Sequence, residues 1–351
     1  MKLTFLGGAN AVTGAEYLLE SGGTKILIDC GLAQGGRYAE SSNWEPFLYR
    51  PADLAAVLVT HAHIDHVGRI PKLAREGFGG AVYSTPPTRD FAETLLLDSE
   101  HILGEEAKEK RREPLYTEAD VLRATSQWRG VPYHEPFTVG PFMVELFDAG
   151  HILGSSFIAI EAEGKHIVFS GDLGNSPAPF IEPREDLPAD TDFVLIESVY
   201  GGRVHEGVNM RRDTLENLIE DTVKRAGVLM IPAFALERTQ ELLFELNGLA
   251  EEGRIPRAPI FIDSPLAIKM TAVYERYSRD PLYMNRDAIA AARRGDAIFK
   301  FPGLAMTLTR EESRAIDGVP PPKVIIAGSG MSQGGRILRH EARYLGDPKN
   351  A

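Results

Sequence analysis

This sequence has only one cysteine, no long apolar run and no excess of basic residues, and each of these features argues against a class of protein. The 351 residues include one cysteine, Cys30, so an intrachain disulfide is excluded and a reducing cytoplasm is the expected location. No apolar run approaches the ~18 residues that span a bilayer, so no membrane partner is expected. Residues 1–6 are expected to form a first strand and not a signal peptide. The net charge of −12 argues against a broad basic surface for duplex DNA, but not against nucleic acid in a local cleft.

The order of the expected strands and helices divides the chain in two. The first half is predicted to contain strands 3–6, 17–20, 25–28, 56–59, 81–84, 143–147, 156–160, 166–169 and 193–196, with helices 67–76 and 87–112. The second half is predicted to alternate helices 210–225, 236–249, 265–277 and 334–345 with strands 228–231, 259–263 and 323–327, after an irregular stretch that precedes 323. Such alternation is typical of a parallel sheet covered by helices. We therefore predict an α/β chain with domains 1–204 and 205–351.

The most informative segment is Thr-His-Ala-His-Ile-Asp-His at 60–66, directly after an apolar run. His61 and His63 are two residues apart, so an extended chain directs both to the same side. Asp65 and His66 follow where the chain turns into an expected helix. Histidine with carboxylate is a ligand set for Zn²⁺, and three of only 9 histidines within six positions argue against a chance cluster. The segment predicts a site for two metal ions.

Further ligand candidates come at the ends of other expected strands, each beside glycine. They are Asp29, His151 in Asp148-Ala149-Gly150-His151, and Asp172 in Gly171-Asp172. Each alone fits an ordinary turn equally well, because Asp-Gly and Gly-Asp pairs are common in turns. Taken together, and in this order along the chain around residues 60–66, these three residues indicate that the strand ends direct them into one shared cleft.

Together these motifs resemble the metallo-β-lactamase superfamily. The resemblance implies a four-layer αββα fold with the metals at one edge of the sheet sandwich. It implies that a first zinc is held by His61, His63 and His151, and a second by Asp65 and His66, with Asp172 bridging the two. Asp29 would orient a ligand through a hydrogen bond.

Four later segments, from residue 195 onward, narrow the resemblance. They are 195–201 with Glu197, 231–241 (IPAFALERTQE), 263–267 (DSPLA), and 328–331 (GSGM) with 334–336 (GGR). They are similar to the β-CASP nucleases, most of all to bacterial and archaeal relatives of the cleavage and polyadenylation specificity factor endonuclease. This implies hydrolysis of single-stranded RNA, with a hydroxide shared by two zinc ions attacking phosphorus and with Asp65, Asp172, Glu197 and Asp29 at the catalytic centre.

The glycine turn at 328–330 is a candidate phosphate site. Backbone N–H groups of Gly328, Ser329 and Gly330 before an expected helix favour an anion, and Arg336 can pair with phosphate oxygens. Without the resemblance, a structural connector explains the turn equally well. The resemblance favours RNA backbone contact. His340, on the same helix, is expected on a solvated face.

In the resembling family a later segment returns to the first domain. It carries a general-acid histidine and the last ligand of the second zinc. No residue of this chain matches either histidine, so the return segment is expected to be absent and the second zinc site one ligand short. A truncated sequence, a second chain that supplies the segment, and a weakly active binding protein all stay open.

Two other functions compete with the ribonuclease. One is a metallo-β-lactamase-fold hydrolase of a thioester, lactam or lactone, and the other is a catalytically weakened RNA-binding subunit. The sequence leaves open endonucleolytic or 5′-3′ exonucleolytic cutting, RNA preference and the native metal. A homodimer is the default expectation.

Overall fold

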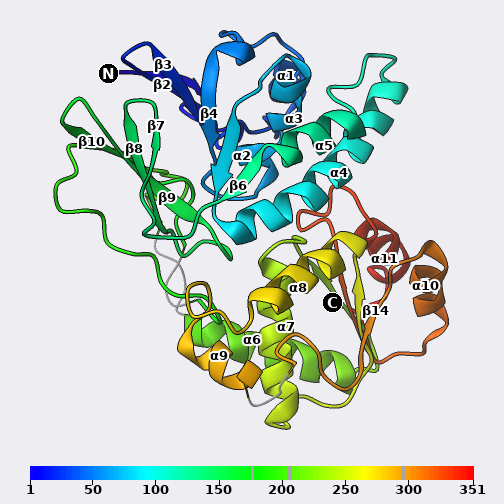
Figure 1. Cartoon of the computed structure of the whole chain (residues 1–351). Helices are drawn as coiled ribbons and strands as arrows, with labels where there is room; N and C mark the ends of the chain where they lie inside the picture. Colours follow the sequence, from blue (N-terminus) through cyan, green and yellow to red (C-terminus); the bar gives the residue numbers. More distant parts are fainter. Residues whose placement is uncertain (175–177, 204–207, 294–296) are drawn as a thin grey trace. The chain divides into compact units, whose positions relative to one another are not determined.

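The computed structural model describes residues 1–174, 178–203, 208–293 and 297–351, which form two compact units (Figure 1). Unit 1 consists of Met1–Ala178 and Glu182–Gly201, and unit 2 of Pro179–Ile181 and Gly202–Ala351. The predicted domain boundary between 204 and 205 falls outside the described residues. Among the helices of the described segments, none is long and apolar enough to cross a membrane.

The first sheet of unit 1 has six strands in the order β1-β2-β3-β4-β5-β6. They are β1 (Lys2–Gly7), β2 (Glu16–Ser21), β3 (Thr24–Ile28), β4 (Leu54–Leu58), β5 (Ala81–Ser84) and β6 (Trp128–Gly130). The first three pair antiparallel, and β3 to β6 pair parallel. The parallel part aligns the ends of β3 and β4, which precede Asp29 and His61.

Helices cover the outer face of this sheet and close the first core. They are α1 (Arg37–Ser42), the 3₁₀ turn η1 (Pro51–Asp53), α2 (Ile64–Val67), α3 (Ile70–Arg75), α4 (Pro86–Glu109) and α5 (Glu118–Ser126). Sheet residues such as Leu27 and Val57 pack with helix residues such as Ile70, Leu96 and Val121. Burying these apolar side chains is the main free-energy gain that holds the layer in place.

The second sheet of unit 1 faces the first. It has five strands in the order β11-β10-β9-β8-β7, with β7 (Phe137–Val139), β8 (Phe142–Asp148), β9 (Ser156–Ala162), β10 (Lys165–Phe169) and β11 (Phe193–Leu195). The rings of Tyr17 on β2 and Phe169 on β10 lie 5.9 Å apart, so side chains of the two sheets meet. The ends of β8 and β10 carry the chain into the segments of His151 and Asp172.

Unit 2 contains a four-stranded, fully parallel sheet in the order β12-β15-β13-β14. Its strands are β12 (Val228–Pro232), β13 (Ile260–Asp263), β14 (Leu304–Met306) and β15 (Lys323–Ala327). All five residues of β15 are buried, as expected of a strand covered on both faces.

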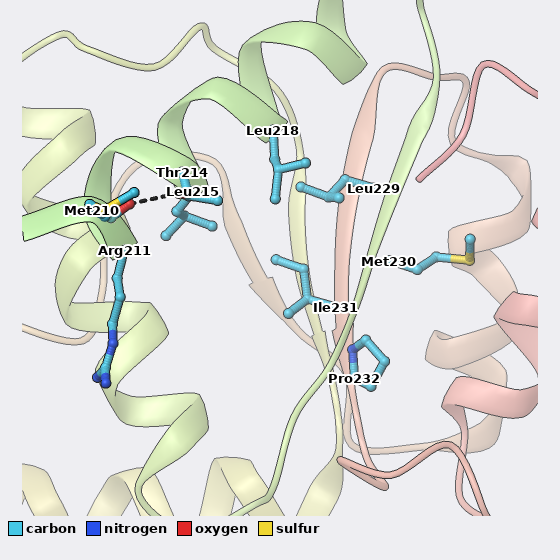
Figure 2. A pocket seen from close by; sticks show the side chains of 9 residues that line it. All are labelled: Met210, Arg211, Thr214, Leu215, Leu218, Leu229, Met230, Ile231 and Pro232. Atoms are coloured by element: carbon cyan, nitrogen blue, oxygen red, sulfur yellow. Dashed lines mark hydrogen bonds between the residues drawn. The ribbon is translucent and has the colours of Figure 1, made fainter. Parts of the chain in front are cut away.

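Helices flank this sheet on both sides (Figure 1). They are α6 (Val208–Lys224), α7 (Arg238–Glu251), α8 (Pro265–Tyr277), α9 (Arg286–Arg293), α10 (Arg310–Ala315), η2 (Ile316–Gly318) and α11 (Ile337–Tyr344). α8 begins where Ser264 accepts a hydrogen bond from the N–H of Ala267, with Pro265 in the first turn. Between α6 and β12, Leu218, Leu229 and Ile231 line a mainly apolar pocket of about 380 Å³ (Figure 2).

The expected α/β class, with a parallel sheet in the second half, is confirmed. The predicted strands and most helices are present with ends shifted by a few residues. The prediction of an irregular stretch before 323 was wrong. The described residues of that stretch include α9, β14 and α10, and β14 belongs to the sheet. The sequence reasoning also missed α5, and α11 begins at 337, where 334 was expected.

Candidate metal centre

The histidine segment leaves β4 in extended conformation and then enters α2. Thr60 is fixed first: its backbone N–H donates to Asp29 Oδ1 over 2.8 Å, and its carbonyl accepts from the N–H of Ser156. These bonds join the end of β4 to β3 on one side and to β9 on the other. The chain therefore presents His61 and His63 from a position anchored in both sheets of unit 1.

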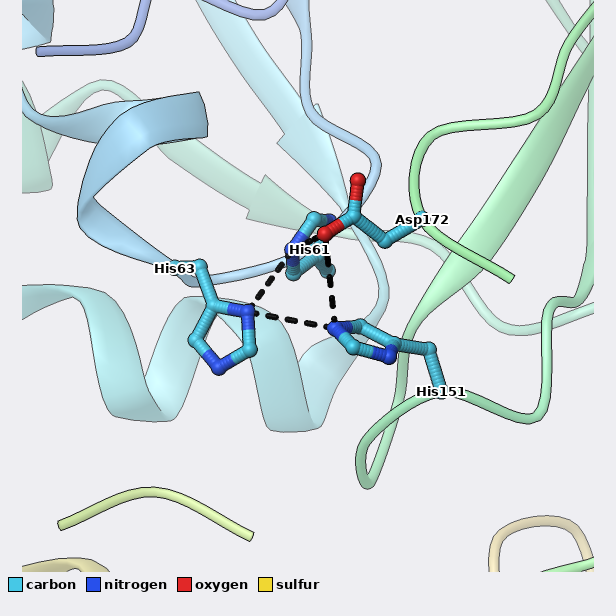
Figure 3. A group of neighbouring side chains, drawn as sticks. All are labelled: His61, His63, His151 and Asp172. Atoms are coloured by element: carbon cyan, nitrogen blue, oxygen red, sulfur yellow. Dashed lines mark hydrogen bonds and ion pairs between the residues drawn. The ribbon is translucent and has the colours of Figure 1, made fainter. Parts of the chain in front are cut away.

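Four side chains from three segments meet at this point (Figure 3). His61, His63, His151 and Asp172 offer ligand atoms that all lie within 4.8 Å of one another. His61 Nε2 and His63 Nδ1 are 3.0 Å apart, and His151 Nε2 is 3.2 Å from the same His63 nitrogen. The carboxylate Oδ2 of Asp172 lies 3.7 Å from His61 Nε2 and 3.6 Å from His151 Nε2.

The spacing fits a divalent cation. Tetrahedral zinc with bonds of about 2.05 Å separates neighbouring ligand atoms by roughly 3.3 Å. The nitrogen–nitrogen and nitrogen–oxygen distances of the cluster bracket that value. Three imidazoles with one carboxylate are also the donor types that zinc prefers. The residues present therefore fit the metal that the sequence predicted.

A second group of donors adjoins the first across Asp172. Its other oxygen, Oδ1, lies 3.3 Å from His66 Nε2, and Asp65 Oδ2 lies 4.0 Å from the same nitrogen. The two oxygens of the Asp172 carboxylate thus face two separate sets of donors. Asp65 and His66, predicted as ligands of a second metal, lie in the second set.

Asp29 fixes the orientation of His66. Asp29 is almost fully buried at the end of β3, and its Oδ2 lies 2.7 Å from His66 Nδ1. The same oxygen accepts a hydrogen bond from Thr60 Oγ1 over 2.8 Å. With Nδ1 bound to Asp29, Nε2 of His66 is the nitrogen that faces Asp172. The sequence predicted this orienting role for Asp29 but gave none to Thr60, whose only signal was its position at the strand end.

The protonation of these groups follows from burial and from their neighbours. Burial lowers the pKa of His61 well below its usual value, helped by nearby histidines, and burial also lowers the pKa of His63. Burial acts against the charged form of His66 too, but Asp29 and Asp172 outweigh it and raise its pKa well above the usual value. Burial opposes ionisation of Asp172, yet the hydrogen bond and charge of His66 lower its pKa to about 2. Neutral His61 and His63 and ionised Asp172 are the states that a metal requires, whereas His66 must release a proton.

Glu197 is placed beside the cluster by its hydrogen bonds. Its carboxylate accepts from the N–H of Leu173, the residue after Asp172, over 3.3 Å and from the N–H of Val199 over 3.1 Å. Its own N–H donates to Ser170 Oγ. Glu197 therefore fixes the turn that carries Asp172.

A cavity of about 760 Å³ opens beside these groups. Asp29, His66, Asp172 and Glu197 all contribute to its wall, as does the phenol ring of Tyr17. The two sides of the wall come from the ends of strands in the two facing sheets. The half-buried carboxylates of Asp172 and Glu197 therefore border a space larger than a water molecule.

Two glycines permit the close approach of the ligand segments, and the sequence reasoning had not assigned them a role. A Cβ on Gly31 would lie 1.5 Å from the carbonyl oxygen of Asp65, and a Cβ on Gly174 would lie 1.5 Å from that of Gly150. Any other residue at either position must displace backbone next to a candidate ligand.

The predicted phosphate residues lie in unit 2. The turn Gly328–Gly335 is closed by bonds from the N–H of Ser329 to the carbonyl of Gly334 and from the N–H of Ile337 to that of Gly328. Arg336 donates to Asp263 over 2.7 Å and to the carbonyls of Thr307 and Leu308. Much of its guanidinium is thus engaged within the chain, which fastens the turn to the end of β13.

His340 takes part in the same network, and its expected solvated position was wrong. It is fully buried, and its Nε2 lies 2.7 Å from Asp263 Oδ2. Asp263 is fully buried as well; burial would raise its pKa, but hydrogen bonds from His340, Ser313, Thr307 and Arg336 together hold it well below the usual value. A buried ionised carboxylate requires such partners, which explains why His340 turns inward.

Known families match both halves of the chain. The metallo-beta-lactamase superfamily matches residues 14–200, and the Beta-Casp domain matches residues 239–351. The chain is 39% identical over its whole length to "Ribonuclease TTHA0252" of Thermus thermophilus, covering 78% of that protein. It is 31% identical over its whole length to "Transcription termination factor FttA" of Methanosarcina mazei, of which it spans about half (55%). A crystal structure of a protein of unknown function from Enterococcus faecalis, 13% identical, shares the fold with a TM-score of 0.50 over 93% of this chain and 77% of that one.

Two facing sheets with a histidine–aspartate cluster at their strand ends define a metal-dependent hydrolase. The chain belongs to the metallo-β-lactamase superfamily and, through its second half, to the β-CASP group within it. The resemblance inferred from the motifs is thereby confirmed. The family binds divalent metals, and the clustered ligands of unit 1 fit that property.

Proposed function

We propose that this chain is a zinc-dependent ribonuclease that hydrolyses phosphodiester bonds of single-stranded RNA. One observation carries the metal part of the proposal: the two oxygens of Asp172 face different histidines, Oδ2 toward His61 and His151 and Oδ1 toward His66. A carboxylate in that position can bridge two ions, with His61, His63 and His151 on one and Asp65 and His66 on the other. The second set has fewer donors, so the second ion should bind more weakly.

The chemistry follows from this ligand set. Two bound zinc ions would stabilise charge on the scissile phosphate and supply a nucleophile derived from water at neutral pH. Asp29 and Thr60 hold His66 in one orientation, so its Nε2 does not need to reorganise when metal binds. Glu197 holds the Asp172 turn in place through the N–H of Leu173.

The substrate class is supported by the relatives. The Thermus relative is named a ribonuclease and shares 39% of its residues with this chain over the whole chain length. A cavity of about 760 Å³ leaves room for a nucleotide beside Asp172 and Glu197. In unit 2, the N–H groups of Gly330 and Met331 have no acceptor within the described residues, and with the turn at 328–330 they are our candidates for phosphate contact. Arg336 we assign chiefly to holding that turn.

The test is cleavage of end-labelled single-stranded RNA by zinc-loaded protein, with EDTA and His61→Ala as the negative arms. His101→Ala is the matched control, because His101 is an exposed histidine outside the cluster. We expect His61→Ala to lose zinc and cleavage together and His101→Ala to retain both. The spacing of the product ladder distinguishes stepwise 5′-3′ cutting from internal cutting.

Retained cleavage in His61→Ala would refute the assignment. RNA binding with bound zinc but without cleavage would favour the RNA-binding subunit, and turnover of a thioester, lactam or lactone without RNA cleavage would favour the other hydrolase. Metal analysis of the purified protein identifies the ion, because iron and manganese share this ligand set. Light scattering of the same sample tests the proposed homodimer.

A further inference from the structure

Phe234 is an aromatic residue that the fold holds partly in solvent. Its relative exposure is 52%, whereas its neighbour Ala233 is buried. Phe234 lies in the segment 231–241, one of the motifs that carry the resemblance to the β-CASP nucleases, and the proposed function assigns no role to this segment. Exposure alone assigns no role to Phe234, because single apolar side chains are common at protein surfaces. Its fixed loop and its contact with the glycine turn distinguish it from the other exposed rings.

The loop around Phe234 is fixed at several points. The N–H of Ala233 donates to the carbonyl of Ala327 at the end of β15. The carbonyl of Phe234 accepts from both the N–H and the hydroxyl of Thr239, a buried residue of α7. The ring is therefore presented by a rigid backbone and needs little further ordering to bind a partner.

The glycine turn lies directly against this ring. A Cβ on Gly330 would be 2.8 Å from both the backbone nitrogen and the ring carbon Cδ2 of Phe234, so ring and turn are in contact. A Cβ on Gly328 would be 3.6 Å from Ser264 Oγ and 3.8 Å from the carbonyl oxygen of Ala233. The ends of β12, β13 and β15 thus converge here, at the edge where parallel α/β sheets bind their ligands.

We propose that Phe234 is a stacking platform for one nucleobase of single-stranded RNA whose phosphate lies on the adjacent turn. The proposal rests on the proposed function and specifies one subsite for it. The phosphate and the base of one nucleotide are separated by a few ångströms. Because the glycine turn and the ring of Phe234 are in contact, one nucleotide can place its phosphate on the turn and its base on the ring. A flat ring accepts any base, because every base has a π-face, so this subsite adds affinity without sequence preference.

The experiment measures RNA affinity while cleavage is suppressed by EDTA. Fluorescence anisotropy would follow a labelled oligouridine of about ten nucleotides and an abasic strand of equal length. The variants are Phe234→Leu, which keeps an apolar side chain without a π-face, and Phe234→Trp, which keeps the π-face. Phe193→Leu is the matched control, because Phe193 is 53% exposed and lies in β11 of unit 1.

We expect Phe234→Leu to weaken oligouridine binding by about 5- to 150-fold and to leave binding of the abasic strand unchanged. Phe234→Trp should bind at least as well as the original chain, and its added indole emission should be quenched by oligouridine. Phe193→Leu should bind like the original chain.

Equal oligouridine affinities of Phe234→Leu and the original chain would overturn the platform while leaving the ribonuclease proposal intact. So would equal losses of affinity for oligouridine and the abasic strand, since that pattern indicates a structural role. Absence of RNA binding by the original chain, in EDTA and with zinc, would overturn the function and the platform together.

Discussion

Asp148 is a buried carboxyl group whose environment makes the stability of unit 1 depend on pH. It ends β8, where its Oδ1 accepts the N–H of Gly150 over 2.7 Å and its own N–H donates to Glu185. Burial raises the pKa of Asp148 to about 7; the Gly150 N–H opposes this rise, and the charges of Glu185 and Glu182 add to it. Near neutral pH the folded protein therefore takes up a proton that the unfolded chain does not hold.

The sign and size of the effect follow from linkage. The pKa of an unfolded aspartate is about 3.9, so between pH 4 and pH 7 the folded state binds more protons and stability falls as pH rises. A difference of about three pKa units corresponds to about 4 kcal/mol in total, of which about 3 kcal/mol falls between pH 5 and pH 8.5. Asp148→Asn keeps an oxygen acceptor for Gly150 but carries no charge at any pH. The variant should escape this loss.

Urea unfolding of the original chain and of Asp148→Asn at pH 5 and pH 8.5 measures the difference. The chain has two tryptophans, Trp44 and Trp128, and both lie in unit 1, so their fluorescence reports the unfolding of that unit. The original chain should lose about 3 kcal/mol more than Asp148→Asn over this pH range. Asp186→Asn, an exposed carboxyl change in the same unit, should follow the original chain. Profiles for the original chain and Asp148→Asn that stay parallel within about 0.5 kcal/mol would refute the reasoning.

Three further changes test the network around the proposed sites. Asp29→Asn should weaken zinc affinity by about 10- to 100-fold in a chelator competition, because the ligand it orients loses its charged partner; an unchanged affinity would contradict that role. Gly174→Ala should sharply reduce zinc affinity, because its Cβ must displace the carbonyl of Gly150, while Gly79→Ala, with open space around it, should not; similar affinities in a zinc titration would rule out the steric argument. Asp263→Ala should lower the free energy of unfolding by about 3–5 kcal/mol, since four buried or half-buried donors lose their acceptor; a loss below about 1 kcal/mol in chemical denaturation would be incompatible with this.

The clustering of the candidate ligands could be predicted from sequence because these residues lie at strand ends. His61 and His63 follow β4, His151 follows β8 and Asp172 follows β10, and strand ends of one sandwich edge converge whatever the loops between them do. The glycine contacts could not be predicted in the same way. That Gly174 abuts Gly150 depends on the packing of two loops, and a glycine in sequence gives no indication of which backbone approaches it.

Two of the missed helices, α5 and α10, had a local signal in the sequence. α5 begins at a capping box formed by Thr117 and Asp120, and α10 at one formed by Thr309 and Glu312. Threonine followed three residues later by an acid is a recognised start of a helix even where apolar periodicity is weak. Strand β14 lacked such a signal: it has three residues, and its pairing with β13 is a tertiary interaction.

Arg336 shows why the candidate phosphate contacts of unit 2 were harder to predict than the histidine–aspartate cluster of unit 1. An arginine beside a glycine turn has the same sequence pattern whether it binds an external phosphate or an internal carboxylate. The deciding partner, Asp263, is 73 residues away along the chain and fully buried. Once that carboxylate is buried and ionised, it must find hydrogen-bond partners within the fold, and Arg336 is one of four side chains that reach it, with His340, Ser313 and Thr307. Metal ligands avoid this competition because their partner ion comes from solvent. The pattern in unit 1 therefore translates directly into a cluster of side chains that can hold a metal ion. In unit 2 the backbone N–H groups of Gly330 and Met331 have no competing acceptor among the described residues, so they stay candidates for the proposed phosphate contact.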